Sequence, residues 1–337
     1  MIKKLTLILF FTTSLVQSQI PNGYYDTATG NDYELKSQLF EIINNQIDQG
    51  YNALDDFYIT NDIDIYYEND NTILDIYSEN PSGTDPYNFS IDNSCGNYSV
   101  EGDCYNKEHI IPQSVFGSNY PMRSDAHQVI PTDGRVNGFR SAYPFGVVGQ
   151  NLVSQSGISN PTQNGSKLGN NLNEGYSMGY SNIVFEPIDE FKGDIARIYF
   201  YFITRYENLI SSWSSYDMFD GSSDKVLQDT FLNILINWHL NDPVSQKEID
   251  RNNQIYLFQG NRNPFVDHPE YVEEIWSSTN DTENPSTPTN IQIFDITDNS
   301  FQLSWDSSSD NVSVDSYNIY IDNTLYANTE NTSYLIS

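Results

Sequence analysis

Three residues of the chain, Glu108, His109 and Asn137, have side chains that suit hydrolysis assisted by a divalent cation. Mg²⁺ prefers oxygen ligands and takes only one or two of them from a protein, so a carboxylate and an amide oxygen would suffice. A histidine that stays off the ion, with a pKa near neutrality, could take a proton from an attacking water. A neighbouring Glu-His pair is common in proteins, so this interpretation depends on the elements that position the three residues.

The elements predicted around these residues bring them together. We expect a strand that carries the Glu-His pair, a second strand over 126–130, and a short helix that Asp133 caps. Asn137 and Arg140 would then lie three positions apart on one face of this helix. Such a ββα unit converges a carboxylate, an amide oxygen and an imidazole on one point, where a cation would polarise a phosphate and stabilise the departing oxygen.

Nearby arginines are candidates for phosphate contact. Arg140 is favoured because it lies beside Asn137, and Arg123 and Arg135 are further candidates; a surface charge or a structural ion pair is the alternative for all three. Between Lys107 and Arg140 four basic side chains face three acidic ones, in a chain whose formal charge is −31. A phosphate would therefore meet a locally positive stretch of an acidic protein.

The remaining histidines are better explained as structural. His127 could orient a water at the site or hydrogen-bond in the core, and the second role is favoured. His239 and His268 lie beside predicted helix ends, where capping or core hydrogen bonds account for them. We therefore assign the proton transfer to His109.

The composition predicts an exported protein. With 46 acidic against 15 basic residues, the chain should repel polyanions unless local basic groups or a divalent cation intervene. Residues 1–18 have the positive start, apolar run and small-residue end of a secretory signal, with cleavage after Ser18. This run is too short to span a membrane. We expect a secreted protein, extracellular or at the cell surface with the periplasm as the alternative, and infer neither a membrane association nor an obligate protein partner.

The two cysteines, Cys95 and Cys104, predict a disulfide, because exported chains use their cysteines in this way. The bond would close a short loop and fix the strand that carries Glu108. Two free thiols are the alternative, and zinc ligation is disfavoured because a second cysteine pair is missing.

The stretch 55–92 is rich in Asp, Asn and Tyr and raises the question of calcium. It lacks the D-x-D-x-D-G spacing with a closing Glu that marks an EF-hand loop. A solvated acidic face is therefore the favoured interpretation.

Apolar residues at helical spacing predict several packed helices. They are expected over 33–54, over 188–202, over 227–238, and from a capping box at Ser245 and Glu248 to about Gly260. The Gly- and Asn-rich stretch 149–180 should be mostly loop.

A composition change marks a second domain. Residues 277–288 have the Ser, Thr, Asn and Pro content of a linker, and residues 289–337 alternate as β-strands do. This part resembles the first half of a fibronectin type III domain, with Trp305 as its core tryptophan. A complete β-sandwich of that kind needs about 100 residues, so we expect an incomplete one.

The part of the chain before this linker resembles the bacterial endonuclease I family of secreted, sugar-nonspecific nucleases. The motifs are "CYNKEHIIPQSVFG", "SDAHQVIPTDGRVNGFRSAYPFG" and "NWHLNDPVSQKEIDRNNQIYLFQGNRNPFVDHPE", within a resemblance that covers about residues 23–276. It implies an α+β fold with a ββα-metal (His-Me finger) core and several packed helices, and a nuclease domain over 19–276.

The resemblance also implies roles for individual residues. Glu108 and Asn137 match the metal ligands and His109 the catalytic histidine, while Asp125 and His127 match a supporting Asp-x-His motif. The family would hydrolyse DNA, with RNA as a further substrate, use Mg²⁺, with Mn²⁺ or Ca²⁺ as alternatives, and leave 5′-phosphate ends. Two neighbours of the supporting motif depart from the family pattern, Ala126 and Gln128, and neither is a metal ligand.

Other functions fit the sequence less well. A protein that binds nucleic acid or extracellular matrix without cutting is the alternative, and the intact set of Glu108, His109 and Asn137 argues against it. The interpretation as a glycan-active enzyme is supported only by the fibronectin-like tail. A zinc protease is disfavoured because His-Glu-x-x-His is absent.

Overall fold

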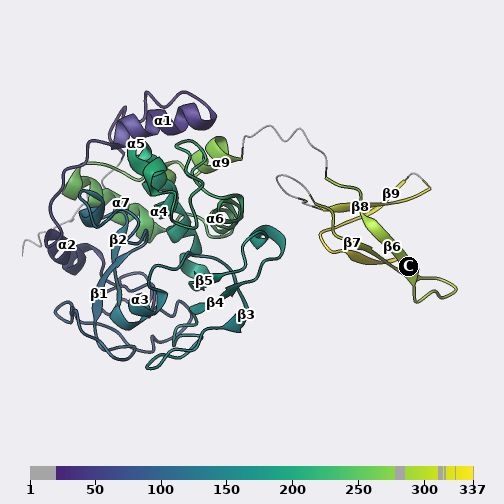
Figure 1. Cartoon of the computed structure of the whole chain (residues 1–337), viewed down its shortest axis with the longest axis horizontal. Helices are drawn as coiled ribbons and strands as arrows, with labels where there is room; N and C mark the ends of the chain where they lie inside the picture. Colours follow the sequence, from purple (N-terminus) through teal and green to yellow (C-terminus); the bar gives the residue numbers. More distant parts are fainter. Residues whose placement is uncertain (1–19, 278–284, 310–313, 315, 323, 337) are drawn as a thin grey trace, which may run out of the picture. The chain divides into compact units, whose positions relative to one another are not determined.

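The computed structural model describes residues 20–277, 285–309, 314, 316–322 and 324–336. The chain divides into two units, Met1–Val272 and Glu273–Ser337, which are described separately (Figure 1). The predicted signal, 1–18, and most of the predicted linker lie outside the described residues.

The first unit combines helices with short antiparallel sheets. Its helices are α1 (Asp32–Ile43), α2 (Ala53–Asn61), α3 (Gly134–Arg140), α4 (Lys192–Arg205), α5 (Glu207–Ile210), α6 (Asp229–Asn241), α7 (Gln246–Gln259) and α8 (Pro264–Asp267), and α9 (Tyr271–Trp276) crosses the division between the units. Its strands are β1 (Tyr105–His109), β2 (Val129–Asp133), β3 (Val148–Leu152), β4 (Lys167–Asn171) and β5 (Ile183–Glu186). The α+β class expected from the sequence is confirmed.

The predicted ββα arrangement is present. β1 pairs antiparallel with β2, with Glu108 opposite Ile130. The Asp133 side chain accepts a hydrogen bond from the Val136 backbone N–H at 2.7 Å and caps α3, as expected. In Figure 1, β1, β2 and α3 lie together in the part of the first unit drawn in blue and teal.

The second strand begins later than expected. The sequence suggested a strand from 126, but β2 starts at Val129. The backbone N–H groups of Gln128 and Val129 both donate to the Asp125 carbonyl at 3.0 Å and make a turn there. The expected start of this strand was thus wrong, because residues 126–128 belong to a turn that backbone hydrogen bonds define.

The first predicted helix is also shorter than expected. α1 ends at Ile43, and the chain re-enters a helix only at α2. Ile47, which the apolar spacing placed on a buried face, is 61% exposed. Gly50 has φ 87°, in the left-handed region, and turns the chain between the two helices. The expectation of one helix over 33–54 was thus wrong beyond Ile43.

The stretch 149–180 contains more regular structure than its composition suggested. β4 pairs antiparallel with both β3 and β5 in a three-stranded sheet. The Asn171 side chain donates to the carbonyls of Ser177 and Tyr180, at 2.7 and 2.8 Å, and so closes the loop between β4 and β5. Asn side chains here support strands, although asparagine usually marks loops.

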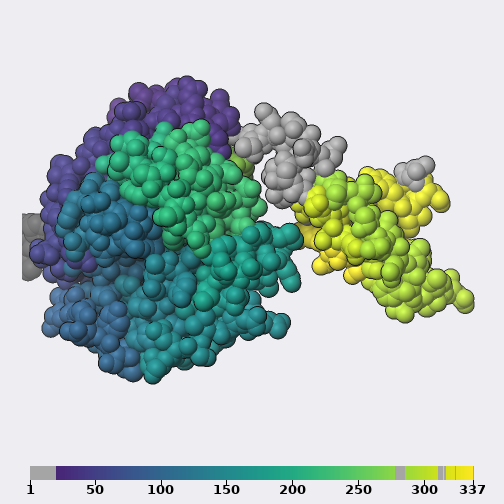
Figure 2. Space-filling view, in the orientation of Figure 1, coloured from purple at the N-terminus to yellow at the C-terminus, as the bar shows by residue number. Residues whose placement is uncertain are grey.

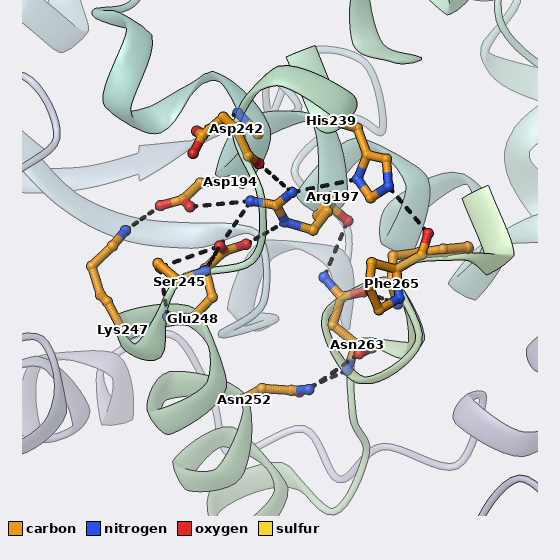
Figure 3. A network of polar contacts seen from close by, with 12 residues as sticks. Asp194, Arg197, His239, Asp242, Ser245, Lys247, Glu248, Asn252, Asn263 and Phe265 are labelled. Carbon is orange, nitrogen blue, oxygen red and sulfur yellow. Dashed lines mark hydrogen bonds and ion pairs between the residues drawn. The ribbon is translucent and has the colours of Figure 1, made fainter. Parts of the chain in front are cut away.

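A buried network ties four helices together (Figure 3). Arg197 of α4 donates to both carboxylate oxygens of Glu248 on α7, at 2.5 and 2.8 Å. It also donates to the Asp242 carbonyl at 2.8 Å and contacts Nδ1 of His239 on α6 at 3.4 Å. The Asn263 side chain, at the start of α8, donates to the Arg197 carbonyl at 3.1 Å. His239 therefore has a structural role in this network.

The helix boundaries in this region follow their local signals. Ser245 and Glu248 form the predicted capping box, and Gly260 ends α7 in the left-handed conformation.

At the surface of the first unit, α1 lies against the green segment that follows α4 (Figure 2). Lys36 of α1 donates a hydrogen bond to Glu207 in this segment at 3.2 Å.

The second unit is rich in β-structure. Its strands are β6 (Thr289–Phe294), β7 (Phe301–Asp306), β8 (Tyr317–Ile321), β9 (Thr324–Thr329) and β10 (Ser333–Ile336). They form a three-stranded sheet, β10-β7-β6, and a two-stranded sheet, β8-β9. Trp305, Ile319 and Ile336 form its buried cluster. Across the described part of both units, every helix is too short or too polar to cross a membrane.

Candidate active site

His109 ends β1 with one ring nitrogen already bonded. Its Nε2 lies 3.0 Å from the Arg123 carbonyl oxygen, and because a carbonyl only accepts, Nε2 must carry the proton. In the neutral ring Nδ1 is then the acceptor. Burial lowers the pKa of His109 to about 4, and the nearby cations Arg123 and Arg140 act in the same direction. This pKa is lower than the near-neutral value expected from the sequence, so the imidazole is neutral at physiological pH, with Nδ1 as its acceptor.

Glu108 is buried beside this histidine, with 2% of its surface exposed. The Tyr77 hydroxyl donates to its Oε1 at 2.9 Å, and Arg140 Nη1 donates to the same oxygen at 3.1 Å. Burial raises the pKa of Glu108 to about 7, although Arg140 and Tyr77 both favour the carboxylate. The two donors approach one oxygen, so Oε2 is the oxygen that a cation could take.

Asn137 lies on α3, and its amide group is oriented by hydrogen bonds. Its Nδ2 donates to Oδ1 of Asn106 at 2.8 Å and to the Lys107 carbonyl at 3.3 Å. These two acceptors assign the nitrogen and oxygen of the amide and leave Oδ1 facing away from them. An amide oxygen oriented in this way and the carboxylate of Glu108 fit the donor set of a hard divalent cation.

The structure places Arg140 differently from the expectation. Its side chain is fully buried, and besides Glu108 it bonds the carbonyls of His109 and Ile110, at 2.9 and 2.8 Å. The guanidinium also lies 4.4 Å from the centre of the Phe145 ring. The expectation that Arg140 contacts phosphate is corrected: a guanidinium enclosed by protein acceptors cannot meet a substrate, and the structural ion pair is what it forms.

The other two candidate arginines differ from each other. Arg135 is buried and donates to the Ser156 carbonyl at 2.7 Å, so it too is engaged within the protein. Arg123 is partly exposed and stacks over the rings of Tyr51 and Tyr120, at 4.7 and 5.8 Å from their centres. Of the three arginines, Arg123 is the one placed beside the imidazole of His109 with surface open to solvent.

A tyrosine joins the cations to the imidazole. The Tyr51 ring is stacked on His109, with ring centres 5.9 Å apart and planes 19° apart. Lys107 lies 4.7 Å from the Tyr51 ring centre and forms an ion pair with Asp55. No motif in the sequence pointed to Tyr51 or Tyr77, because both come from loops far from the Glu-His pair in the chain. Lys107 could have been found as the base next to Glu108.

Asp125 and His127 lie in the core. The Asp125 carboxylate accepts hydrogen bonds from the hydroxyls of Tyr201 and Tyr206, at 3.0 and 2.8 Å, and from the Gln259 amide at 2.8 Å. His127 packs on the Tyr201 ring, with centres 4.3 Å apart, and its Nε2 lies 3.3 Å from the Asn261 carbonyl. Both residues connect the turn before β2 to helices α4 and α7, and these contacts fix the position of β2 in the core.

The disulfide and Arg262 stabilise the fold around the site. Cys95 and Cys104 are bonded, as predicted, directly before β1. Arg262 is buried and donates to both carboxylate oxygens of Asp267, at 2.6 and 2.7 Å, so it closes the fold and does not face a substrate.

A neutral imidazole at the end of a strand, next to a carboxylate and packed beside the helix that carries an oriented amide, has the groups that phosphodiester hydrolysis requires. The protein is a nuclease. The chain belongs to the Endonuclease I family, whose model matches residues 31–270 and therefore spans the whole ββα unit. Members of this family typically depend on a metal ion.

Three proteins similar to this chain are also named as nucleases. An extracellular ribonuclease of Bacillus amyloliquefaciens is 31% identical over 267 residues, 75% of this chain and 78% of that protein. An extracellular ribonuclease of Bacillus subtilis (strain 168) is 32% identical with the same coverage. Endonuclease-1 of Buchnera aphidicola is 29% identical over 145 residues, 43% of this chain and 45% of that protein.

Proposed function

We propose that the chain is an exported, divalent-metal-dependent endonuclease that cleaves DNA and RNA with little sequence preference and leaves 5′-phosphate ends. The observation that carries the proposal is the state of His109: its Nε2–H is bonded to the Arg123 carbonyl, and its Nδ1 is an available base beside Glu108. Export is supported by the disulfide and by the two similar proteins named extracellular ribonuclease.

The protein's own groups divide the work. His109 accepts the proton of the attacking water at Nδ1, and the Arg123 carbonyl stabilises the imidazolium that results. Arg123 and Lys107 are placed to bind the phosphate, since both lie against Tyr51 next to the imidazole. Arg140 and Tyr77 hold Glu108 in position from inside the protein.

Glu108 and Asn137 would hold the cation, through carboxylate Oε2 and amide Oδ1. Mg²⁺ is the proposed ion, with Mn²⁺ or Ca²⁺ as alternatives, because both ligands are hard oxygens. When bound there, the cation would neutralise phosphate charge and favour departure of the leaving oxygen.

The function is tested by incubating the purified protein with plasmid DNA and with RNA, in Mg²⁺ or in EDTA. We expect cleavage of both in Mg²⁺, none in EDTA and almost none by His109→Ala. His268→Ala is the matched control, because that imidazole is partly exposed and bonds Glu270 in another part of the fold. Products should accept a new 5′ label only after phosphatase treatment.

Two results would contradict the proposal. Cleavage that survives both EDTA and His109→Ala would exclude the mechanism. Metal-dependent binding of DNA without any nicking would instead support the alternative of a binding protein on the same fold.

We also propose that the C-terminal strands belong to a separate fibronectin type III-like sandwich around Trp305. Its support is the burial of Trp305 with Ile319 and Ile336. Trp305→Ala in the full chain should then remove one unfolding transition in calorimetry and leave nuclease activity unchanged. Loss of activity together with that transition would argue against a separate domain.

A further inference from the structure

A group of three carboxylates lies outside the catalytic residues. Asp64, Glu68 and Glu79 each place one carboxylate oxygen within 4.8 Å of the others. Asp64 and Glu79 are buried, and Glu68 is exposed at the edge of the group. Like charges this close repel each other, and burial increases the cost.

Glu79 makes this group unusual. It is 1% exposed, and its Oε1 is buried without a hydrogen-bond partner among the described residues. Buried charges in proteins are normally paired or bound to a metal ion. Between Lys36 and Lys107 the sequence contains no lysine, arginine or histidine, so the local chain offers Glu79 no counter-charge.

The electrostatics of the group favour a bound cation. Burial raises the pKa of Glu79 to about 9, and the neighbouring carboxylates of Asp85, Glu68 and Asp64 act in the same direction. The pKa of Asp85 is also raised, to about 6, mainly by burial. Without a cation the group must therefore keep a proton at neutral pH.

The loop that supplies two of the carboxylates is already folded around one of them. The Asp64 carboxylate accepts hydrogen bonds from the backbone N–H groups of Tyr66, Tyr67, Glu68 and Asn69, at 3.0 to 3.2 Å. These four donors hold the buried carboxylate of Asp64 at a fixed position in the loop. They also fix the position of Glu68 relative to Asp64.

We propose that Asp64, Glu68 and Glu79 form a Ca²⁺ site, distinct from the catalytic site. Ca²⁺ binds six to eight oxygens at about 2.3–2.6 Å in flexible geometry, so two ligands on opposite sides of the ion are roughly 5 Å apart. The three oxygens lie within 4.8 Å of one another, close enough for one such ion to reach all of them. Mg²⁺ requires shorter bonds of about 2.0–2.1 Å and near-octahedral geometry, and it usually keeps several waters instead of an all-protein set of carboxylates.

The site connects to the catalytic residues through one turn of the chain. Glu79 donates its backbone N–H to the Asp75 carbonyl at 2.9 Å. The Asp75 side chain accepts from the backbone N–H of Asp133, the cap of α3, at 2.7 Å. Tyr77, between them, bonds Glu108. Ca²⁺ at Glu79 would thus stabilise the turn that positions both Glu108 and α3.

Thermal unfolding of the full chain tests the site. Protein freed of metal with EGTA is unfolded without divalent cation, with Ca²⁺ and with Mg²⁺. We expect Ca²⁺ to raise the midpoint of the wild type by about 5 °C and Mg²⁺ to raise it less. Glu79→Gln should match or exceed the wild type without metal, because it removes repulsion, and should lose most of the Ca²⁺ shift.

Three variants distinguish this site from a general charge effect and from Ca²⁺ bound at the catalytic residues. Glu41→Gln, on the exposed face of α1, changes the net charge equally and should keep the full shift. Asn137→Ala removes a catalytic ligand and should also keep it. Glu68→Gln changes an exposed side chain, so it tests the site even if Glu79→Gln does not fold. A wild type that Ca²⁺ does not stabilise, or a shift that persists in Glu68→Gln and Glu79→Gln, would overturn the proposal.

Discussion

Glu108 and Glu79 are both buried glutamates of the first unit, yet they have opposite surroundings. Glu108 has an internal cation, Arg140, and a hydroxyl donor, Tyr77. Glu79 has an oxygen without a partner among the described residues, and other carboxylates as neighbours. Glu108 is therefore held in place by the protein itself, whereas Glu79 in the proposed Ca²⁺ site would depend on a cation from solution.

The largest expected difference between the two sites is in activity. His109→Ala should lower the rate of DNA cleavage by about 10²–10⁴-fold, because it removes the proposed general base. Glu79→Gln should lower it by less than about tenfold in saturating Mg²⁺ and Ca²⁺, since it acts only through the turn that carries Tyr77. Initial rates of plasmid nicking measure both. Equal losses would mean that the two sites are not separate.

Removing the internal cation should make Glu108 resemble Glu79. Arg140→Met leaves a buried carboxylate unpaired and should lower the free energy of unfolding by about 3–5 kcal/mol without metal. Part of this loss should return with Mg²⁺, which is measured by urea unfolding with and without the ion. Arg135→Met, which removes a bond to a backbone carbonyl, is the control and should show no metal-dependent recovery.

The next prediction concerns the effect of low pH on His127, a buried histidine that is neutral in the folded protein. Burial lowers the pKa of His127 from 6.5 to about 4, so the unfolded chain takes up the proton first as the pH falls. The free energy of unfolding should therefore decrease between pH 6.5 and 4, by up to about 3 kcal/mol from this group. Urea unfolding across this range should give a shallower pH dependence for His127→Gln. An unchanged dependence would show that His127 does not contribute.

The smallest effect is expected from a substitution that places a positive charge next to Glu79. Glu68→Lys places an ammonium group next to Glu79 and should raise the metal-free midpoint of thermal unfolding by about 3 °C. Added Ca²⁺ should then have little further effect. A variant that Ca²⁺ still stabilises as much as the wild type would show that the ion binds elsewhere.

Local signals predicted much of the catalytic unit. The Asp133 cap and the spacing of Asn137 and Arg140 are properties of neighbouring residues, and they led to the correct helix. The capping box at Ser245 likewise marked the start of α7. Strand and helix limits that depend on turns, such as the start of β2 and the end of α1, were less accurate.

The remaining features depend on contacts between distant segments. Tyr51 and Tyr77 reach the site from loops, and the burial of Arg140 follows from packing around α3, so the sequence pattern could not reveal them. The acidic group was missed for a related reason. Its members stand at 64, 68 and 79, a spacing that matches no calcium-loop motif and becomes a cluster only after the loops fold.

The way in which Arg140 bonds β1 has a practical consequence. It holds the strand through the main-chain carbonyls of His109 and Ile110, which are present whatever side chain stands at these positions. Replacing the imidazole should therefore leave the strand in register and the proposed metal ligands in place. If His109→Ala is inactive as proposed, it is for this reason a suitable form for trapping uncut DNA or RNA in crystals, where the path of the bound strand could be seen directly.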